Sequence, residues 1–454
     1  MIGIVLCCLA FIATLLATRR SLGAGLLVAA LFGYLYGILR ANILSPASHF
    51  IFDGSLVGLY VAFGSKFFDR DRRISELRLW TVILIAWPCL LCLLPFQPFM
   101  VSLVGLRGNI FFLPALLVGA RLRHDDVRKL SIGLAVLNLG ALVIGVMEYF
   151  KGLEMFFPYS PVTAIMYSSA DVAGGHHRIP SVFSSAHAYA GSMCCTIPFL
   201  FGAWVQKDES KFRKLLLLCG MMAALGGVLM ASTRLFFVVA LYFVTIAMLS
   251  SNISPRLRIL WMMMIVLMGT LALTNERFQR FKMLSDSEGV KDRIAGSVNR
   301  SFLETLQEYP MGNGLGGGGT SMPYFLEGEV RHPISLEIEY GRILAEQGII
   351  GLILWIAFIL WCMLRRTAFI AHPWLPTRRL IWFWALIWFI NAMIGTGVLT
   401  AIPITLFFIM ALGWSVVEPA VEDRAPVTDR SRGGARGIQP VPSWRVAGQQ
   451  RFDF

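Results

Sequence analysis

Long apolar runs recur along the whole chain and leave it few folds to adopt. We count thirteen runs, at 1–18, 21–39, 49–64, 80–96, 109–120, 131–148, 187–205, 214–231, 235–251, 258–274, 343–363, 379–394 and 398–414. About 20 apolar residues in a helix cross the hydrocarbon core of a bilayer, where a lipid-exposed backbone must satisfy its own hydrogen bonds. The runs at 49–64 and 109–120 are the weakest and could be re-entrant or interfacial. The pattern predicts an all-α polytopic membrane protein with twelve to fourteen transmembrane helices.

The composition agrees with this class. Of the 454 residues, 56% are hydrophobic and 15% are charged, whereas soluble domains carry about 25% charged residues. The first run, 1–18, is expected to stay as a span, because Arg19 and Arg20 follow it and no small-residue cleavage site is present. All eight cysteines lie in predicted spans, so we expect no disulfide framework.

Lysine and arginine gather at alternate connections between the runs. These connections are Arg19–Arg20, 65–79, 121–129, 206–214, 251–258 and 364–379. Short basic loops face the cytoplasm, so the alternation predicts an N-terminus outside and a C-terminal tail inside. The net charge of +13 then reflects topology. Its dispersal over short turns argues against a nucleic-acid partner.

The same alternation divides the chain into regions. A transmembrane region covers 1–414, with polar loops 148–186 and 275–342 on the outer face, which in a bacterium is the periplasmic side of the inner membrane. Residues 415–454 are rich in Pro, Gly and Arg and poor in aliphatic residues. Such a segment cannot bury a core, and we expect a disordered cytoplasmic tail.

Arg234 interrupts a long apolar stretch within Ala231-Ser232-Thr233-Arg234. An arginine at mid-helix costs about 2.5–3.5 kcal/mol on insertion scales and less near an interface. The stretch is long enough for two spans, which predicts a tight turn facing outward. Arg234 could snorkel from that turn to the interface, or it could be a functional arginine held in a polar cavity.

The first outer loop ends in an arginine and a serine-rich stretch, Arg178 to Ser185. Hydroxyl groups, backbone N–H groups and the positive end of a helix suit an anionic, oxygen-rich ligand. Ser184 or Ser185 could instead be the N-cap of the following span. For Arg178 we favour a functional role.

The second outer loop holds most of the remaining polar groups. Arg293 and Arg300 lie in a helix-like context and are candidates for substrate binding. The glycine cluster 312–319 is not followed by Lys and Ser or Thr, so it is not a Walker A loop. Gly314 and Gly316 could take positive φ and let a bulky ligand approach the backbone, or the cluster could be a hinge.

Histidine and carboxylates follow the glycines. His332 could act as a general base or donate to phosphate, or it could be a plain exposed loop histidine. The histidines have no metal-ligand spacing, so we expect no metal and no cofactor. If the segment is helical, Glu339, Arg342 and Glu346 share one face and could form ion pairs, while Glu337 points elsewhere and is the freer carboxylate.

The order of these motifs resembles the superfamily of O-antigen ligases and O-antigen polymerases (Wzy-type), which are bacterial membrane glycosyltransferases. The resemblance covers roughly residues 80–415. It is carried by the segment from Arg178 to Ser185, by Ser232-Thr233-Arg234, by a loop arginine ahead of a helix, by Pro310 to Gly316, by His332 and by the segment from Ala345 to Leu352.

The resemblance implies metal-independent transfer of a glycan from an undecaprenyl-diphosphate carrier at the periplasmic face. The acceptor is lipid A–core in ligases and another lipid-linked repeat in polymerases, which also work with a chain-length regulator. Arg178 and Arg234 would hold the donor diphosphate, and His332 would orient or deprotonate the acceptor hydroxyl. Pro333 follows His332 where ligases commonly have asparagine, which leaves Glu337 or Glu339 as alternative bases.

Two other classes of protein remain open. A lipid-linked oligosaccharide flippase or a secondary transporter would place ionisable groups near the bilayer midplane, and Asp53 in a weak span is the residue it could use. A signalling or assembly scaffold would not depend on Arg178 and Arg234. The concentration of charge in the outer loops favours the glycosyltransferase.

Overall fold

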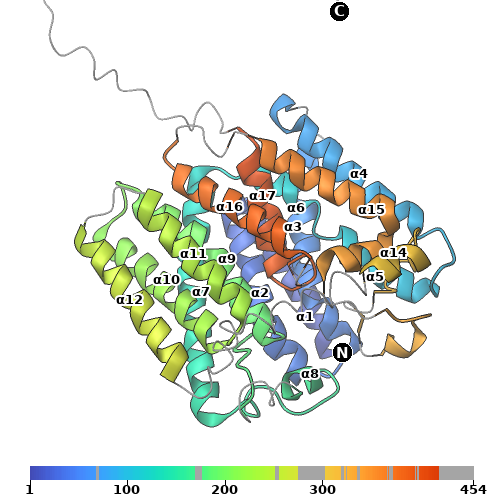
Figure 1. Cartoon of the computed structure of the whole chain (residues 1–454), viewed down its shortest axis with the longest axis horizontal. Helices are drawn as coiled ribbons and strands as arrows, with labels where there is room; N and C mark the ends of the chain where they lie inside the picture. The colour runs from blue at the N-terminus through green and yellow to red at the C-terminus, as the bar shows by residue number, and fades with distance from the viewer. Residues whose placement is uncertain are drawn as a thin grey trace, which may run out of the picture.

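The structure is a computed structural model that describes residues 1–67, 71–168, 176–250, 255–274, 302–318, 322–323, 325–334, 338–365, 367, 372–393, 395 and 398–418. The regular structure in these residues is helical throughout, and no strand occurs among them (Figure 1). The predicted all-α polytopic fold is therefore confirmed. Most of the tail, 419–454, lies outside the described residues.

The principal helices follow the apolar runs in order. They are α1 (Ile2–Arg20), α2 (Leu22–Asn42), α3 (Ile51–Phe67), α4 (Ser75–Leu91), α5 (Phe99–Ile110), α6 (Ala115–Ala120), α7 (His124–Lys151), α9 (Ala186–Val205), α10 (Lys211–Met230), α11 (Arg234–Ser250), α12 (Pro255–Thr274), α15 (Glu339–Leu364), α16 (Leu375–Asn391) and α17 (Ile404–Val416). Short helices α8 (Ala164–Tyr167) and α14 (Leu303–Glu308) lie in the two polar loops.

Within the described residues, nine helical segments are long and apolar enough to cross a membrane. The weak run at 49–64 lies in one of them, Pro46–Phe67, where the 3-10 helix η1 (Pro46–Phe50) leads into α3. The weak run at 109–120 lies in another, Phe99–Ala120, which joins α5 and α6. Two shorter apolar helices cover Arg234–Leu249 and Ile404–Val416. The protein is thus a multi-pass membrane protein.

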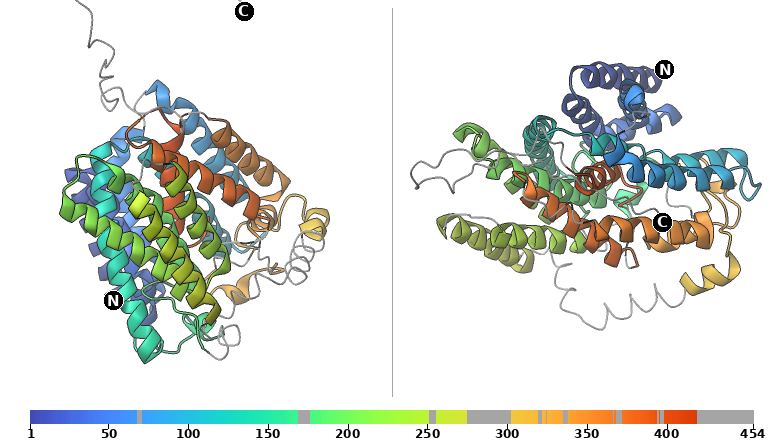
Figure 2. Two further views of the ribbon diagram at one scale, coloured as in Figure 1. Left: turned by 60° about the vertical axis from the view of Figure 1, so that its left-hand side comes forward. Right: turned by 90° about the horizontal axis from the view of Figure 1, so that it is seen from above.

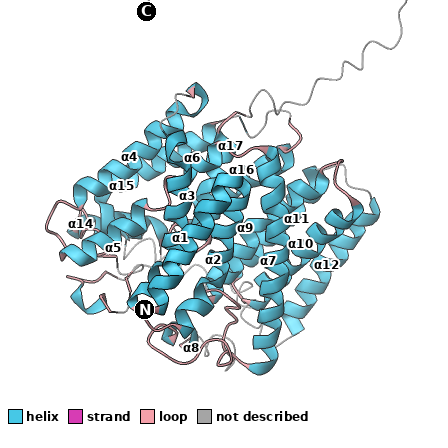
Figure 3. Ribbon diagram, turned by 180° about the vertical axis from the view of Figure 1, so that it is seen from behind, coloured by secondary structure: helices cyan, strands magenta, loops and turns pink. Residues whose placement is uncertain are grey.

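Helices α9 and α17 form the centre of the bundle. Every residue of α17 is buried, as are nearly all residues of α9. Helix α17 packs against α6, α9 and α16, while α9 also packs against α7, α10 and α11. Figures 2 and 3 show α17 surrounded by the other helices. Helices α1 and α12 lie on the outside and present many exposed apolar side chains, as lipid-facing helices do.

Four of the six basic connections meet at one end of the bundle. Contacts that join them are Arg365 with Glu76, Arg128 with Glu209 at 2.5 Å, and the Gln206 side chain with the Pro373 carbonyl oxygen at 3.1 Å. These bonds link 65–79, 121–129, 206–214 and 364–379, which alternate along the chain. These basic connections, which alternate along the sequence, therefore lie together at one end of the folded molecule.

Candidate functional site

The predicted turn before Arg234 is present. Helix α10 ends at Met230 and α11 begins at Arg234, so only three residues connect the two helices. Ser232 takes a left-handed conformation with φ 51°, which reverses the chain in this short space. Arg234 is partly buried at the first position of α11. The Oγ1 atom of Thr233 is buried and has no hydrogen-bond partner among the described residues.

Arg178 lies close to Arg234. Burial lowers the pKa of Arg178, and the positive charge of Arg234 lowers it further. The Nε atom of Arg178 is buried and makes no hydrogen bond to any described residue. Two guanidinium groups, 56 positions apart in sequence, are thus brought together in a place partly shielded from water. Such an arrangement favours an anion, because two neighbouring positive charges both attract a negative group.

The turn that follows Arg178 is fixed by Glu148, near the end of α7. The Glu148 carboxylate accepts the backbone N–H of Ser181 at 2.8 Å, and the Ser181 hydroxyl donates to the Ala141 carbonyl oxygen at 2.6 Å. Ser181 has φ 54°, a strained conformation for a residue with a side chain. The backbone N–H of Ile38 on α2 donates to the Val182 carbonyl oxygen at 3.2 Å. The segment is therefore tied to two helices.

Two helix N-termini converge at this site. Ser185 is the N-cap of α9, and its hydroxyl accepts the N–H of Ala188 at 3.1 Å. His187 in the first turn of α9 contacts Phe236 in the first turn of α11, with ring centroids 4.9 Å apart. The positive ends of both helix dipoles therefore add to the charges of Arg178 and Arg234.

The start of α15 lies beside the same region. The N–H groups of Glu339 and Tyr340 donate to the carbonyl oxygens of Gly395 and Ala392, both at 3.1 Å. A side chain at Gly395 would lie 3.8 Å from Leu235, the neighbour of Arg234. The end of α16 thus connects the first turn of α15 with the first turn of α11.

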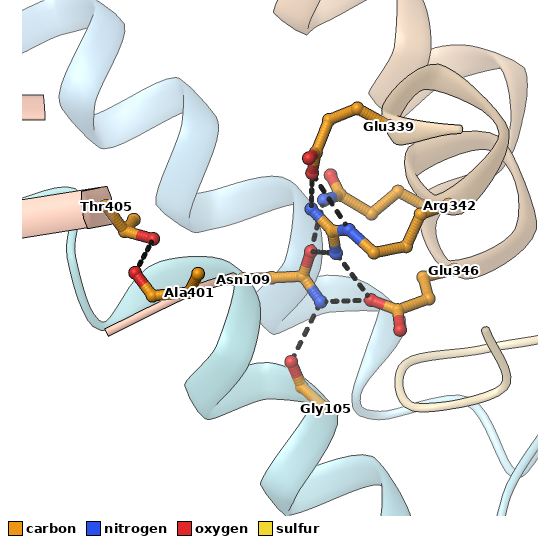
Figure 4. Close-up of polar contacts among 8 residues, drawn as sticks. Gly105, Asn109, Glu339, Arg342, Glu346, Ala401 and Thr405 are labelled. Carbon is orange, nitrogen blue, oxygen red and sulfur yellow. Dashed lines mark hydrogen bonds and ion pairs between the residues drawn. The ribbon is translucent and has the colours of Figure 1, made fainter. Parts of the chain in front are cut away.

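The first turns of α15 carry a buried polar network (Figure 4). Arg342 pairs with Glu339 at 3.0 Å and with Glu346 at 3.1 Å, as the sequence predicted. Asn109 of α5 donates to Glu346 at 2.6 Å and accepts from Arg342 at 3.1 Å and from Gln347 at 2.8 Å. The candidate Glu339 is therefore held inside an ion-pair network and is almost fully buried.

The glycine cluster packs onto this network. Gly312, Gly314 and Gly316 all have positive φ, between 83° and 88°. The space beside them is occupied by the chain itself: a Cβ on Gly314 would lie 2.6 Å from Phe96, and one on Gly316 would lie 2.7 Å from Met322. The described part of the cluster is therefore a buried turn, and its glycines permit close packing.

His332 lies on the adjoining loop with its side chain exposed and its φ at 49°. Asn313 donates from Nδ2 to the His332 carbonyl oxygen at 2.7 Å, and Gln97 donates to the Arg331 carbonyl oxygen at 2.8 Å. These two amides tie the histidine turn to the glycine cluster and to the loop before α5. Three other candidates, Arg293, Arg300 and Glu337, lie outside the described residues.

Compared with protein-family models and with curated proteins, the chain matches no family model and no curated relative. The geometry of the site brings Arg178, on the turn before α9, near Arg234 at the start of α11. It places Glu339 in a buried network next to this region, and His332 on a loop that packs on the same network.

The sequence patterns did not predict a role for Glu148, Asn109, Asn313 or Gln97. Glu148 lies at the end of an apolar run, and a carboxylate there is itself a signal, because it must be paired or line a polar cavity. Asn109 lies at the start of the weak run 109–120, and its amide was an equally visible polar interruption. The partners that hold them in the site, Ser181 for Glu148 and Glu346 for Asn109, lie 33 and 237 positions away along the chain.

Proposed function

We propose that the protein is a membrane glycosyltransferase that transfers or polymerises a glycan carried on undecaprenyl diphosphate. The observation that carries the proposal is that Arg178, on the turn before α9, lies near Arg234, the first residue of α11. Guanidinium groups bind phosphate oxygens in a bidentate manner. Two of them match a diphosphate, whose two phosphate groups are adjacent and negatively charged.

The reaction would proceed at the sugar carbon that bears the diphosphate. The acceptor hydroxyl forms a new bond to this carbon, the bond between the carbon and the diphosphate oxygen breaks, and undecaprenyl diphosphate leaves. Negative charge grows on the leaving oxygen, where Arg178 and Arg234 stabilise it. His332 or Glu337 takes the proton of the acceptor hydroxyl, a role that the resemblance implies.

The orientation that we propose places this site at the periplasmic face of a bacterial inner membrane. Four of the six basic connections gather at one end of the bundle, joined by pairs such as Arg128 with Glu209, and the positive-inside rule puts that end in the cytoplasm. The short turn at Arg234 and the start of α15 belong to the connections that alternate with the basic ones. The same rule therefore puts them on the opposite side of the membrane. A membrane-embedded carrier lipid can reach such a site from the side.

The rival function, a lipid-linked oligosaccharide flippase or secondary transporter, has less support. Asp53, the residue that it could use, pairs with Arg107 at 2.7 Å. Arg342 is likewise paired inside α15. Each of these charges is paired with an opposite charge within the protein.

The test is the glycan profile of a deletion strain that carries the wild type, Arg234→Ala or the control Arg72→Ala. Arg72 is an exposed arginine at the opposite end of the bundle. We expect Arg234→Ala to insert normally and to give no product, and Arg72→Ala to behave like the wild type. Single lipid-linked repeats without long chains indicate a polymerase, and long chains left on the carrier indicate a ligase.

Two results would count against the proposal. Normal product from a well-inserted Arg234→Ala variant would remove Arg234 from the donor site. Repeat units trapped on the cytoplasmic side would indicate the flippase.

A further inference from the structure

A narrow apolar groove lies between α11 and α16, which pack side by side (Figure 1). Its lining residues come from the first turns of α11, the last turns of α16 and the segment after α16. They are Leu235, Phe236, Val239, Trp384, Ile387, Trp388, Asn391, Ala392, Gly395 and Val398. The amide of Asn391 already donates to the Ile387 carbonyl oxygen at 2.9 Å. The groove therefore offers mainly hydrocarbon and aromatic surface.

The groove begins next to the arginine pair. Leu235, one of its lining residues, follows Arg234 directly, and Phe236 contacts His187 in the first turn of α9. A ligand in the groove would thus have one end beside Arg234 and Arg178. Cationic groups next to an apolar groove match an amphiphile that has an anionic head and a hydrocarbon tail.

The groove also borders surface suited to lipid. Val238 on α11 is 50% exposed and Ile390 on α16 is 59% exposed, and each lies next to a groove residue in sequence. Exposed aliphatic residues on membrane helices face hydrocarbon. A chain could therefore pass from the bilayer into the groove without crossing water.

We propose that this groove binds the hydrocarbon chain of the lipid whose phosphate groups contact Arg178 and Arg234. The inference rests on the proposed function for the identity of that lipid, a long-chain polyprenyl phosphate. Its part next to the head group lies along Val239 and Ile387. The groove then selects donors by their chain, and the arginines select them by their charge.

The test measures binding of sugar-free lipids to the purified full chain in detergent, by native mass spectrometry. The probes are undecaprenyl phosphate, the short-chain geranyl phosphate, and phosphatidic acid, whose chains are fatty acyl. We expect the wild type to bind undecaprenyl phosphate at least about tenfold more tightly than geranyl phosphate, because more apolar surface leaves water. Phosphatidic acid should compete poorly.

Two matched pairs of variants locate the chain. Val239→Trp fills the groove from α11, and its control Val136→Trp adds the same ring on an exposed apolar face of α7. Ile387→Trp fills the groove from α16, and its control Ile12→Trp adds the ring on an exposed face of α1. We expect both groove variants to lose the preference for the long chain and to keep the binding of geranyl phosphate, which also shows that they are folded. Both controls should keep the preference.

Three outcomes would overturn the inference. One is an unchanged chain preference in Val239→Trp and Ile387→Trp. Another is equal binding of phosphatidic acid, which would mean that ordinary bilayer lipid occupies the groove. The third is a wild type without chain preference. Because the probes carry no sugar, a failure of glycan transfer would leave the binding result intact, and the two proposals can fail separately.

Discussion

The side-chain amide of Asn313 donates to the carbonyl oxygen of His332 over 2.7 Å, and this bond holds the left-handed backbone that presents the imidazole. The backbone N–H of Asn313 also donates to Ala345 in α15 at 2.6 Å. One residue thus connects the histidine turn, the glycine cluster and the start of a membrane helix.

Replacing Asn313 should reduce activity through the position of His332. Asn313→Ala removes two hydrogen bonds to carbonyl oxygens, at Arg331 and His332. Each is worth about 0.5–1.5 kcal/mol. Asn313→Asp should be worse, because a carboxylate cannot donate and repels both oxygens. Glycan product and thermal unfolding of the purified protein measure the two effects. Full activity in Asn313→Asp would contradict this role.

Glu148→Ala should loosen the turn that carries Arg178. The buried N–H of Ser181 loses its acceptor, which costs about 1–3 kcal/mol. Glu148→Gln keeps an oxygen that can accept this N–H and should retain most of the product. Comparing the glycan product of the two variants separates the effect of the hydrogen bond from the effect of the charge. If glutamine is as damaging as alanine, the carboxylate has a role other than holding Ser181.

Arg342→Met should be strongly destabilising. It leaves Glu339 and Glu346 as two buried carboxylates without their guanidinium, and breaking a buried ion pair costs about 3–5 kcal/mol. Adding Glu339→Gln and Glu346→Gln to the same chain should recover much of the loss, because no unmatched charge then remains. Thermal unfolding in detergent measures both chains. A triple variant no more stable than Arg342→Met would refute the charge argument.

His372 should make stability depend on pH. Burial lowers its pKa to about 3, and the nearby His124 and Arg378 act in the same direction. Its Nδ1 atom accepts the N–H of Trp374 at 3.1 Å, which requires the neutral ring. Below about pH 6.5, His372 binds a proton in the unfolded chain but not in the folded chain. The contribution of His372 to stability is therefore complete above that pH and falls as the pH drops toward 3.

His372→Gln tests this pH dependence, because glutamine does not titrate. The melting temperature of the wild type should fall more steeply than that of the variant between about pH 7 and about pH 5. Parallel curves would exclude His372 as the source.

Chelation should leave glycan transfer unchanged. No group of three or more His, Cys, Asp or Glu side chains in the described part of the chain could hold a metal ion, and the arginines can supply the positive charge that phosphate chemistry needs. The measurement is product formation with and without EDTA. Strong inhibition that a divalent ion reverses would contradict the metal-free mechanism.

The helices could be predicted well from sequence because a bilayer imposes one simple requirement, a long apolar helix. Each of the thirteen runs overlaps a helix. The run 109–120 covered only the end of α5, because Arg107 interrupts the apolar character of that helix. Arg107 is tolerated there because Asp53, 54 positions away, pairs with it. Such a partner cannot be identified from a local run.

The candidate site was predicted in part. Arg178 and Arg234 stood out because a charge near an apolar span is expensive, but their closeness depends on how α9 packs against α11. The ion pairs of Arg342 followed from helical spacing alone. The polar amides of Gln97 and Asn313 could not be found, because such residues are ordinary in loops until their partners are known.

Helix α15 is interrupted at Gly348, whose φ of 69° is outside the helical range. The preceding loop supplies hydrogen-bond partners to the backbone at this interruption. The N–H of Ile349 donates to the Pro310 carbonyl oxygen at 2.9 Å, and the Ala345 carbonyl oxygen accepts from the N–H of Asn313. During synthesis the loop leaves the ribosome before the helix does. We therefore expect the span to complete its hydrogen bonding only after residues 310–313 have returned to it.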